Sequence, residues 1–435
     1  MTRLALRLIA LFTITLSAAS QLRAQNPIGS WQATLPAGSE GLRIMLKIDK
    51  GETSGTAGSW KGTLYSIDQA SKGYPTTTLT ITGALIKFTV DDYHVSYEGT
   101  FSPDGNSITG TFTQGKSQPL TFNRATEATA WPIDPSPHKI QFVPVQADVK
   151  LEVLDWGGTG RPLVLLTGLG DDAHVYDKFA LKLTPHYHVY GITRRGFGDS
   201  SAPPPTVANY NADRLGDDVL AVISALKLNH PIVVGHSIAG EELSSIGSRH
   251  PEKVAALIYL DAAFPYAFYN HANTDWILDM VDVRTQIDAI QAGAVLEPKF
   301  VDNMLTGVAQ LEKDLQETKQ DLAKMQPPYP PAPPPLGLAI KFGQQKYTQI
   351  PAPILSIVAC PHAFDDDDVH STPEGKAAII KEDGIRCTAQ ADAFQSGVPS
   401  AHIVRMPNAD HYVFKSNEAD TLREMNAFIA TLPGN

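Results

Sequence analysis

A serine at position 237 stands in a segment whose residue types favour a sharp turn between a strand and a helix. Residues 232–240 run IVVGHSIAG, so a β-branched run leads into Gly235, Ser237 and Ala239. The β-branched run favours a buried strand, and the small residues on either side of the serine leave room for a strained turn. A serine presented in this way at the start of a helix is a candidate nucleophile for acyl transfer.

This segment resembles the nucleophile turn of the α/β-hydrolase family, and the likeness extends from about residue 138 to the end of the chain. The family pattern G-x-S-x-G is complete except for its second glycine, where this chain has Ala239. The resemblance implies a histidine base after the last strand of the sheet. Residues 408–412 (NADHY) follow a strand expected to end at Met406, so we predict His411 as the base rather than His402, which precedes that strand.

Two carboxylates compete for the role of the acid that orients this histidine. Family members place the acid after the strand that follows the nucleophile helix, which gives Asp261, or after the next strand, which gives Asp365. We favour Asp261, because residues 359–364 contain no carboxylate directly after the later strand. This placement resembles the haloalkane dehalogenase branch of the family.

An acyl-transfer site also needs hydrogen-bond donors where negative charge develops on the carbonyl oxygen. The resemblance implies two backbone donors, the N–H of Ile238 and the N–H of Leu169 in the loop Thr167-Gly168-Leu169-Gly170. Residues 193–200 (TRRGFGDS) are similar to the family loop D-x-R-G-x-G-x-S, with an arginine or a threonine in place of the usual aspartate. The sequence offers no physical account of that replacement.

The chain before residue 138 has the composition of an all-β domain. Period-two alternation and turn residues predict about eight short strands, at residues 29–35, 42–48, 63–67, 76–81, 85–90, 95–101, 107–112 and 120–124. We expect a barrel-like accessory domain over residues 26–125, closed as a barrel or folded as a sandwich, and loosely similar to a lipocalin-like module. A proline-rich linker over residues 126–137 follows it.

From residue 138 to 435 the pattern changes to buried strands that alternate with helices, which predicts a mostly parallel sheet covered on both faces. Strands are expected at residues 162–166, 187–193, 231–234, 255–260, 353–358 and 403–406. A cap insert is expected at about residues 265–350. Its helix over 301–325 carries an apolar stripe, and we expect the insert to pack as a cap over the active edge of the sheet, the alternative being a subunit interface or an SH3-type ligand.

The start of the chain and its composition bear on where the protein works. Residues 1–24 combine Arg3 and Arg7 with an apolar run and small residues near Ala24, the pattern of a cleaved secretion signal, and no later segment is apolar enough to span a membrane. We therefore expect an exported, periplasmic or secreted protein. The net charge of −11 argues against nucleic-acid or anionic-membrane partners. The two cysteines, Cys360 and Cys387, could pair or stay separate.

These observations favour an exported serine hydrolase that cleaves a carboxylic ester, or a related acyl bond of a small molecule, through Ser237, His411 and Asp261. The alternatives are a perhydrolase or cofactor-free haloperoxidase that uses the same triad, or a non-catalytic binding protein that uses the N-terminal domain. No cofactor is implied, and the sequence does not set the oligomeric state. His362 and the acidic residues 365–368 lack a recognised ligand spacing, so we predict no metal site.

Overall fold

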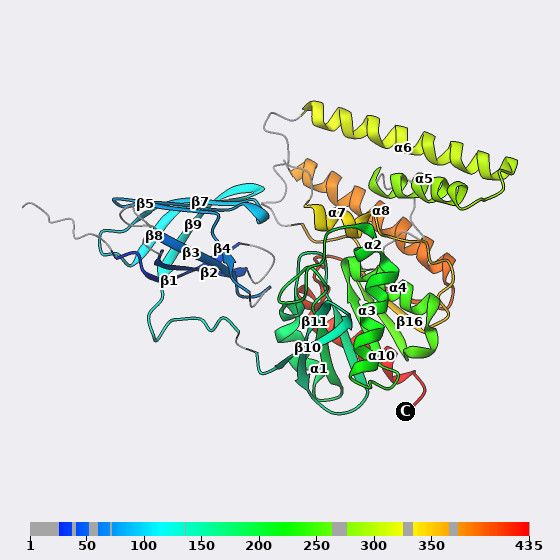
Figure 1. Cartoon of the computed structure of the whole chain (residues 1–435), viewed down its shortest axis with the longest axis horizontal. Helices are drawn as coiled ribbons and strands as arrows, with labels where there is room; N and C mark the ends of the chain where they lie inside the picture. The colour runs from blue at the N-terminus through cyan, green and yellow to red at the C-terminus, as the bar shows by residue number, and fades with distance from the viewer. Residues whose placement is uncertain are drawn as a thin grey trace, which may run out of the picture.

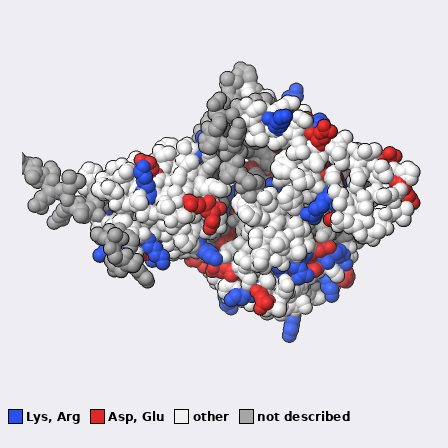
Figure 2. All heavy atoms as spheres, turned by 45° about the horizontal axis from the view of Figure 1, so that its top comes forward, with Lys and Arg blue, Asp and Glu red and all other residues white. Residues whose placement is uncertain are grey.

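The computed structural model describes residues 26–36, 41–51, 60–69, 72–134, 136–262, 276–324, 334–364 and 373–434. These residues form two separate β-sheets, with helices on the second sheet alone (Figure 1). The secretion signal and Asp365 lie outside the described residues. No described helix combines the length and the apolar character that crossing a bilayer requires. On the face shown in Figure 2, acidic and basic side chains are interspersed.

The N-terminal domain is one antiparallel sheet of nine strands in the order β4-β3-β2-β1-β9-β8-β7-β6-β5. Trp31, Leu46, Ile86, Ile108 and Phe122 fill its inner face and are fully buried. The predicted all-β, barrel-like domain is confirmed as a curled antiparallel sheet, and no ladder joins β4 to β5 among the described residues. The strands are β1 Gly29–Leu35, β2 Leu42–Lys50, β3 Trp60–Ser66, β4 Tyr74–Pro75, β5 Thr78–Thr82, β6 Leu85–Val90, β7 Val95–Phe101, β8 Ser107–Gln114 and β9 Lys116–Arg124.

The second sheet has eight strands in the order β10-β11-β13-β12-β14-β15-β16-β17. Strands β12 to β17 are parallel, whereas β10 and β11 form an antiparallel hairpin at one edge that the sequence analysis did not predict. This is the predicted α/β-hydrolase architecture. The strands are β10 Lys139–Gln146, β11 Val149–Gly157, β12 Pro162–Leu166, β13 His188–Ile192, β14 Ile232–His236, β15 Ala256–Leu260, β16 Ile354–Ala359 and β17 His402–Met406.

Alternate residues of the central strands pack into two different cores, one on each face of the sheet. On β12, Leu163 and Leu165 belong to the core that includes α1 and α10, whereas Val164 and Leu166 belong to the core that includes α3 and α4. Because both faces are buried, the strands are apolar throughout. The helices are α1 Asp177–Leu183, α2 Val207–Tyr210, α3 Ala212–Ala225, α4 Gly240–Arg249, α8 Pro373–Gly397, α9 Val413–Ser416 and α10 Glu418–Ala430, with short 3₁₀ turns η1 Asp91–Tyr93, η2 Ala173–Tyr176, η3 Ser237–Ala239 and η4 Pro251–Lys253.

The cap contains α5 Trp276–Gln291, α6 Pro298–Lys324 and α7 Pro335–Lys341. In Figure 1, α6 is the outermost helix and lies beside α5, and α7 lies closer to the sheet. Leu305, Val308, Leu315 and Leu322 of α6 are exposed, so this apolar stripe does not pack against the sheet. Helical spacing shows that one face is apolar but does not show what covers it. Within the described part of the cap, α7 packs against Ile238 next to the nucleophile.

Candidate active site

Ser237 occupies the turn between β14 and α4. Its φ of 54° lies in the left-handed region that a residue with a side chain rarely adopts, which is the strained conformation expected of a nucleophile turn. A Cβ added at Gly235 would lie 3.0 Å from the Cβ of Ala239, and one added at Gly240 would lie 2.0 Å from the carbonyl oxygen of Ala262. The glycines that the turn requires are therefore Gly235 and Gly240, and Ala239 is accommodated as a buried residue.

His411 and Asp261 come together after the ends of β17 and β15. The Nδ1 atom of His411 lies 2.6 Å from Oδ2 of Asp261. An ionised carboxylate only accepts hydrogen bonds, so Nδ1 carries a proton, and in the neutral ring the lone pair is then on Nε2. Like Ser237, Asp261 has a positive φ, 45°, which marks a second strained turn at the end of the neighbouring strand.

The carboxylate of Asp261 is buried and accepts three hydrogen bonds. Besides His411, its donors are the backbone N–H of Ala359 on Oδ1, at 2.9 Å, and Nε2 of His362 on Oδ2, at 3.0 Å. Burial alone would raise the pKa of Asp261, but the hydrogen bonds and charges of His362 and His411 lower it to about 2. Asp261 is therefore ionised at every pH at which the folded protein is expected to work.

His362 is a second histidine on the same carboxylate, and the sequence analysis did not assign it to the site. Its Nδ1 lies 3.1 Å from each carboxylate oxygen of Asp383 on α8, and its backbone N–H donates to Asp383 at 2.7 Å. Burial lowers the pKa of His362, but the Asp261 and Asp383 carboxylates raise it to about 9. His362 is thus an imidazolium between two carboxylates at neutral pH.

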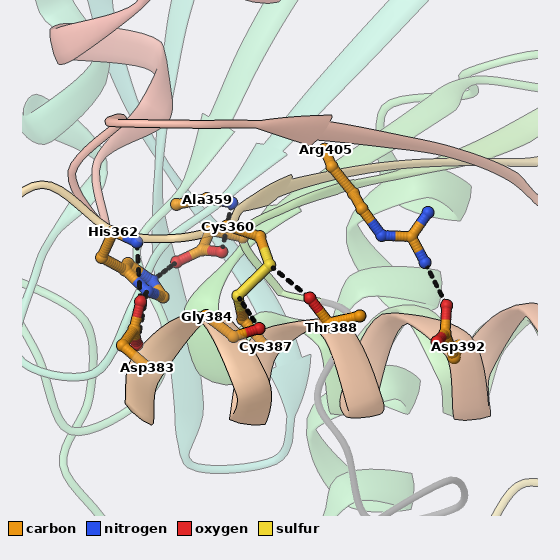
Figure 3. Close-up of a disulfide and its surroundings, with 10 residues drawn as sticks. Ala359, Cys360, His362, Asp383, Gly384, Cys387, Thr388, Asp392 and Arg405 are labelled. Carbon is orange, nitrogen blue, oxygen red and sulfur yellow. Dashed lines mark hydrogen bonds and ion pairs between the residues drawn. A yellow bond between two sulfur atoms is a disulfide. The ribbon is translucent and has the colours of Figure 1, made fainter. Parts of the chain in front are cut away.

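A disulfide fixes the helix that carries Asp383. Cys360, directly after β16, is bonded to Cys387 of α8, which settles the pairing that the sequence left open. Figure 3 shows His362 and Asp383 on the same side of the bond, one turn of helix before Cys387. The available signal for His362 was its position just after β16, because residues that follow neighbouring parallel strands meet at one edge of the sheet.

His236 connects the nucleophile turn to the histidine loop. Its Nε2 donates to the backbone carbonyl of His411 at 2.9 Å, and the two rings lie 4.5 Å apart. Burial and the His411 charge lower the pKa of His236 to about 3, so the ring is neutral. Among the described residues, no hydrogen bond joins the Ser237 hydroxyl to His411. Such catalytic hydrogen bonds often shorten only when substrate is bound.

The loop that carries Leu169 is held by a buried arginine. The guanidinium of Arg194 donates to the carbonyls of Thr167 at 2.7 Å and Gly168 at 3.0 Å, and it pairs with the buried carboxylate of Glu242. In a planar trans peptide the C=O and the following N–H point in opposite directions. Arg194 therefore orients the N–H of Leu169 away from itself. This contact gives Arg194 a role in the predicted oxyanion site.

The threonine that replaces the family aspartate also has a structural role. Thr193 donates to Glu152 at 2.7 Å and accepts the backbone N–H of Ala173 at 3.0 Å. The next arginine, Arg195, forms a buried ion pair with Asp218 on α3. The loop is thus fixed by buried polar contacts on both sides of Arg194.

Helix α7 covers the region around the two predicted oxyanion donors. Ile238 packs in an apolar cluster with Leu336 and Ile340 of α7, and a Cβ added at Gly337 would lie 3.8 Å from the Leu169 side chain. Leu169 remains 37% exposed, so the loop also faces solvent. These residues form an apolar surface next to Ser237, and an apolar surface of this kind can line a pocket for an acyl group.

Asp261, His362 and His411 each offer one ligand atom, and these atoms lie within 4.8 Å of one another. The observed hydrogen bonds already account for this arrangement, so the site needs no metal to hold it together. The structure places Ser237, His411, Asp261, Ile238 and Leu169 at the same edge of the sheet. The competing acid Asp365 lies outside the described residues.

Comparisons with known proteins agree with the fold. The alpha/beta hydrolase family matches residues 163–424, which is more than half of the chain. The chain therefore belongs to the alpha/beta hydrolase family.

Individual relatives are distant and differ in their reactions. The 2-(acetamidomethylene)succinate hydrolase of Mesorhizobium japonicum is 21% identical over 62% of this chain and 89% of its own length. A protein of Mycobacterium phage D29 assigned to the non-heme haloperoxidases is 33% identical, but the match spans only 24% of this chain and 37% of that protein. Among solved structures, a bromoperoxidase from Bacillus anthracis is 17% identical over 67% of this chain and all of its own, with a TM-score of 0.45.

Proposed function

We propose that this protein is a serine hydrolase that cleaves a carboxylic ester of a small, partly apolar acid through an acyl-enzyme intermediate. The observation that carries the proposal is the pairing of a strained serine at a strand-to-helix turn with a histidine whose Nδ1 lies 2.6 Å from a buried carboxylate. Ester is the default substrate class, although the same residues cleave amides, thioesters and carbon–carbon bonds on this fold and the fold alone does not choose between them.

In the proposed reaction, His411 Nε2 takes the proton of the Ser237 hydroxyl as the serine oxygen attacks the carbonyl carbon. The N–H groups of Ile238 and Leu169 stabilise the negative oxygen that forms. His411 then gives the proton to the leaving alcohol, and the C–O bond to it breaks. A water molecule, deprotonated by the same histidine, releases the acid and restores Ser237.

Asp261 and Arg194 would act through other groups in this mechanism. Asp261 holds His411 in the tautomer that leaves Nε2 free and stabilises the imidazolium that forms. Arg194 keeps the peptide between Gly168 and Leu169 in one orientation, so the oxyanion donor is in place before the reaction starts. The apolar contacts of α7 with Ile238 and Leu169 support an acyl group of modest size.

Export, as expected from residues 1–24, belongs to the same proposal. The disulfide between Cys360 and Cys387 supports it, since such bonds persist mainly in oxidising compartments. A small-molecule substrate, rather than nucleic acid, agrees with the net charge of −11. Fractionation of the native host, followed by mass measurement of the mature N-terminus, checks this part. A cytosolic protein that still carries Met1 would refute the proposed export.

The test of the reaction is hydrolysis of p-nitrophenyl esters from acetate to octanoate, with Ser237→Ala as the control. The proposal predicts saturable hydrolysis by the wild type and a loss of at least about 10³-fold in the variant. The similarity to a phage haloperoxidase favours one alternative, a perhydrolase that forms a peracid on the same serine. Halide oxidation that requires both acetate and peroxide, without ester hydrolysis, would favour that alternative and contradict ours.

A further inference from the structure

Two histidines and two aspartates meet outside the candidate active site, where the linker joins the hydrolase domain. Asp134 belongs to the linker, and His138 directly precedes β10. His174 lies in η2, and Asp177 is the first residue of α1. One ligand atom from each of the four residues lies within 4.8 Å of the other three. The sequence did not indicate this cluster, because its two halves are separated by more than thirty residues.

The four side chains lie close enough for one ligand atom of each to reach a single small cation, with His138 using one of its two nitrogens. His138 Nε2 lies 3.1 Å from Asp134 Oδ2, and His138 Nδ1 lies 3.2 Å from Asp177 Oδ1. His174 Nδ1 lies 3.2 Å from Asp177 and 3.9 Å from Asp134. Bonds of about 2.0–2.1 Å in a tetrahedral zinc site place the ligand atoms roughly 3.3–3.5 Å apart. A small adjustment would therefore close the four residues around one ion.

The histidines of the cluster are buried but not fully hydrogen-bonded. The side chain of His138 is 1% exposed and that of His174 is 2% exposed. Both ring nitrogens of His138 lie at ion-pair distance from carboxylate oxygens but outside hydrogen-bond geometry, and Nε2 of His174 has no hydrogen-bond partner among the described residues. A buried polar atom without a partner costs free energy. A metal ion bound to one nitrogen of His138 would remove part of that cost.

Neighbouring groups orient the ligands, as they do in metal sites generally. The indole N–H of Trp156 donates to Asp177 Oδ1 at 3.1 Å and to Ser136 at 2.9 Å, so it ties the linker to α1. The Asp172 side chain accepts the backbone N–H of His174 at 3.0 Å and fixes the start of η2. The ring of His138 packs against Trp156.

We propose that Asp134, His138, His174 and Asp177 form a structural site for one divalent transition-metal ion, with Zn²⁺ as the best match. Two imidazole nitrogens and two carboxylate oxygens suit four-coordinate zinc, whereas calcium takes six to eight oxygen ligands. The ion would fix the linker to the segment that follows the predicted oxyanion loop. His174 and Asp177 also line a cavity of about 220 Å³ between the two domains, which gives an ion a route of entry.

The experiment uses the full mature chain without an affinity tag, treated with EDTA and then titrated with ZnCl₂ by calorimetry. We expect about one Zn²⁺ per chain and a higher melting temperature with zinc than with EDTA. His174→Ala and Asp134→Asn are expected to weaken binding by roughly 100-fold or more, because each removes a ligand. Asp134 is partly exposed, so Asp134→Asn keeps the test valid if the buried variant does not fold.

Two controls identify the site. His188→Ala removes a histidine that pairs with Asp155 at 2.9 Å outside the cluster, and it should leave binding unchanged. His362→Gln removes the second histidine that hydrogen-bonds Asp261 in the candidate active site, and it should also leave Zn²⁺ binding unchanged. Titration with Co²⁺ should give the intense visible absorption of a four-coordinate ion. No stoichiometric Zn²⁺ binding, equal binding by Asp134→Asn, or loss of binding in His362→Gln would overturn the proposal.

Discussion

The guanidinium of Arg194 donates a hydrogen bond of 3.0 Å to the carbonyl oxygen of Gly168, the residue before the predicted oxyanion donor Leu169. A second hydrogen bond, to Thr167, fixes the preceding peptide in the same way. Two successive peptide planes are thus oriented by one side chain. The same guanidinium forms a buried ion pair with Glu242, so the proposed oxyanion site would depend on this pair as well as on the turn glycines.

Arg194→Lys tests this dependence while it keeps a positive charge beside Glu242. A lysine cannot donate to both carbonyls and the carboxylate in the same geometry. We expect kcat for a p-nitrophenyl ester to fall by about 10- to 100-fold, with little change in KM, since misplacing one oxyanion donor mainly affects the transition state. The matched control is Arg249→Lys, at a partly exposed ion pair on α4. Equal kcat values for both variants would contradict the role of Arg194.

Asp261→Asn tests the assignment of the acid. The amide can present its NH₂ group to His411 and favour the wrong tautomer, so kcat is expected to fall by about 10⁴-fold at neutral pH. Asp365→Asn is the matched variant, because Asp365 is the competing acid from the sequence. We expect less than about a twofold change in that variant. A large loss in Asp365→Asn with activity retained in Asp261→Asn would reverse the assignment.

His362 is predicted to make stability depend on pH. Its pKa is raised from 6.5 in the unfolded chain to about 9 in the folded protein. The stabilisation from the protonated ring is therefore fully present below pH 6.5 and is lost as the pH rises through 9. Urea unfolding of the wild type and His362→Gln should show the largest difference at pH 6 and the smallest near pH 10. The exposed His402→Gln is the control. A difference that grows with pH would contradict the assigned charge.

The disulfide between Cys360 and Cys387 is predicted to stabilise α8 and the position of Asp383. The bond closes a loop with a sequence separation of 27, for which the chain-entropy estimate is about 3–4 kcal/mol. Chemical denaturation with and without a reducing agent measures this contribution, and the double variant Cys360→Ala/Cys387→Ala is the control that should not respond to the reductant. If the wild type is also insensitive to a reductant that breaks the bond, the predicted contribution is wrong.

The sequence predicted the parts of the site that depend on local residue patterns. The turn at Ser237 follows from a β-branched run next to small residues, and the position of His411 follows from the last strand of the sheet. His362 was missed because its contact with Asp261 joins residues 101 apart, and it depends on β15 and β16 being neighbours. Sequence order alone does not give strand order in a sheet.

Two other features of the structure differ from the prediction made from the sequence, and for similar reasons. The apolar stripe of α6 was correctly placed on a helix, but its exposure depends on which elements pack against that helix. The cluster around His138 was missed because the linker was interpreted only as a separator between domains, whereas the fold brings Asp134 and His138 against His174 and Asp177. Both features depend on tertiary packing, which residue spacing does not specify.

The most direct test of the account is labelling of the purified mature protein with a fluorophosphonate probe, with Ser237→Ala in parallel. The probe reacts with a serine only when a neighbouring base activates it. We expect one label per wild-type chain, a labelled peptide that contains Ser237, and no label in the variant. A folded wild-type protein that stays unlabelled, or a variant that is labelled equally, would contradict the claim that Ser237 is an activated nucleophile.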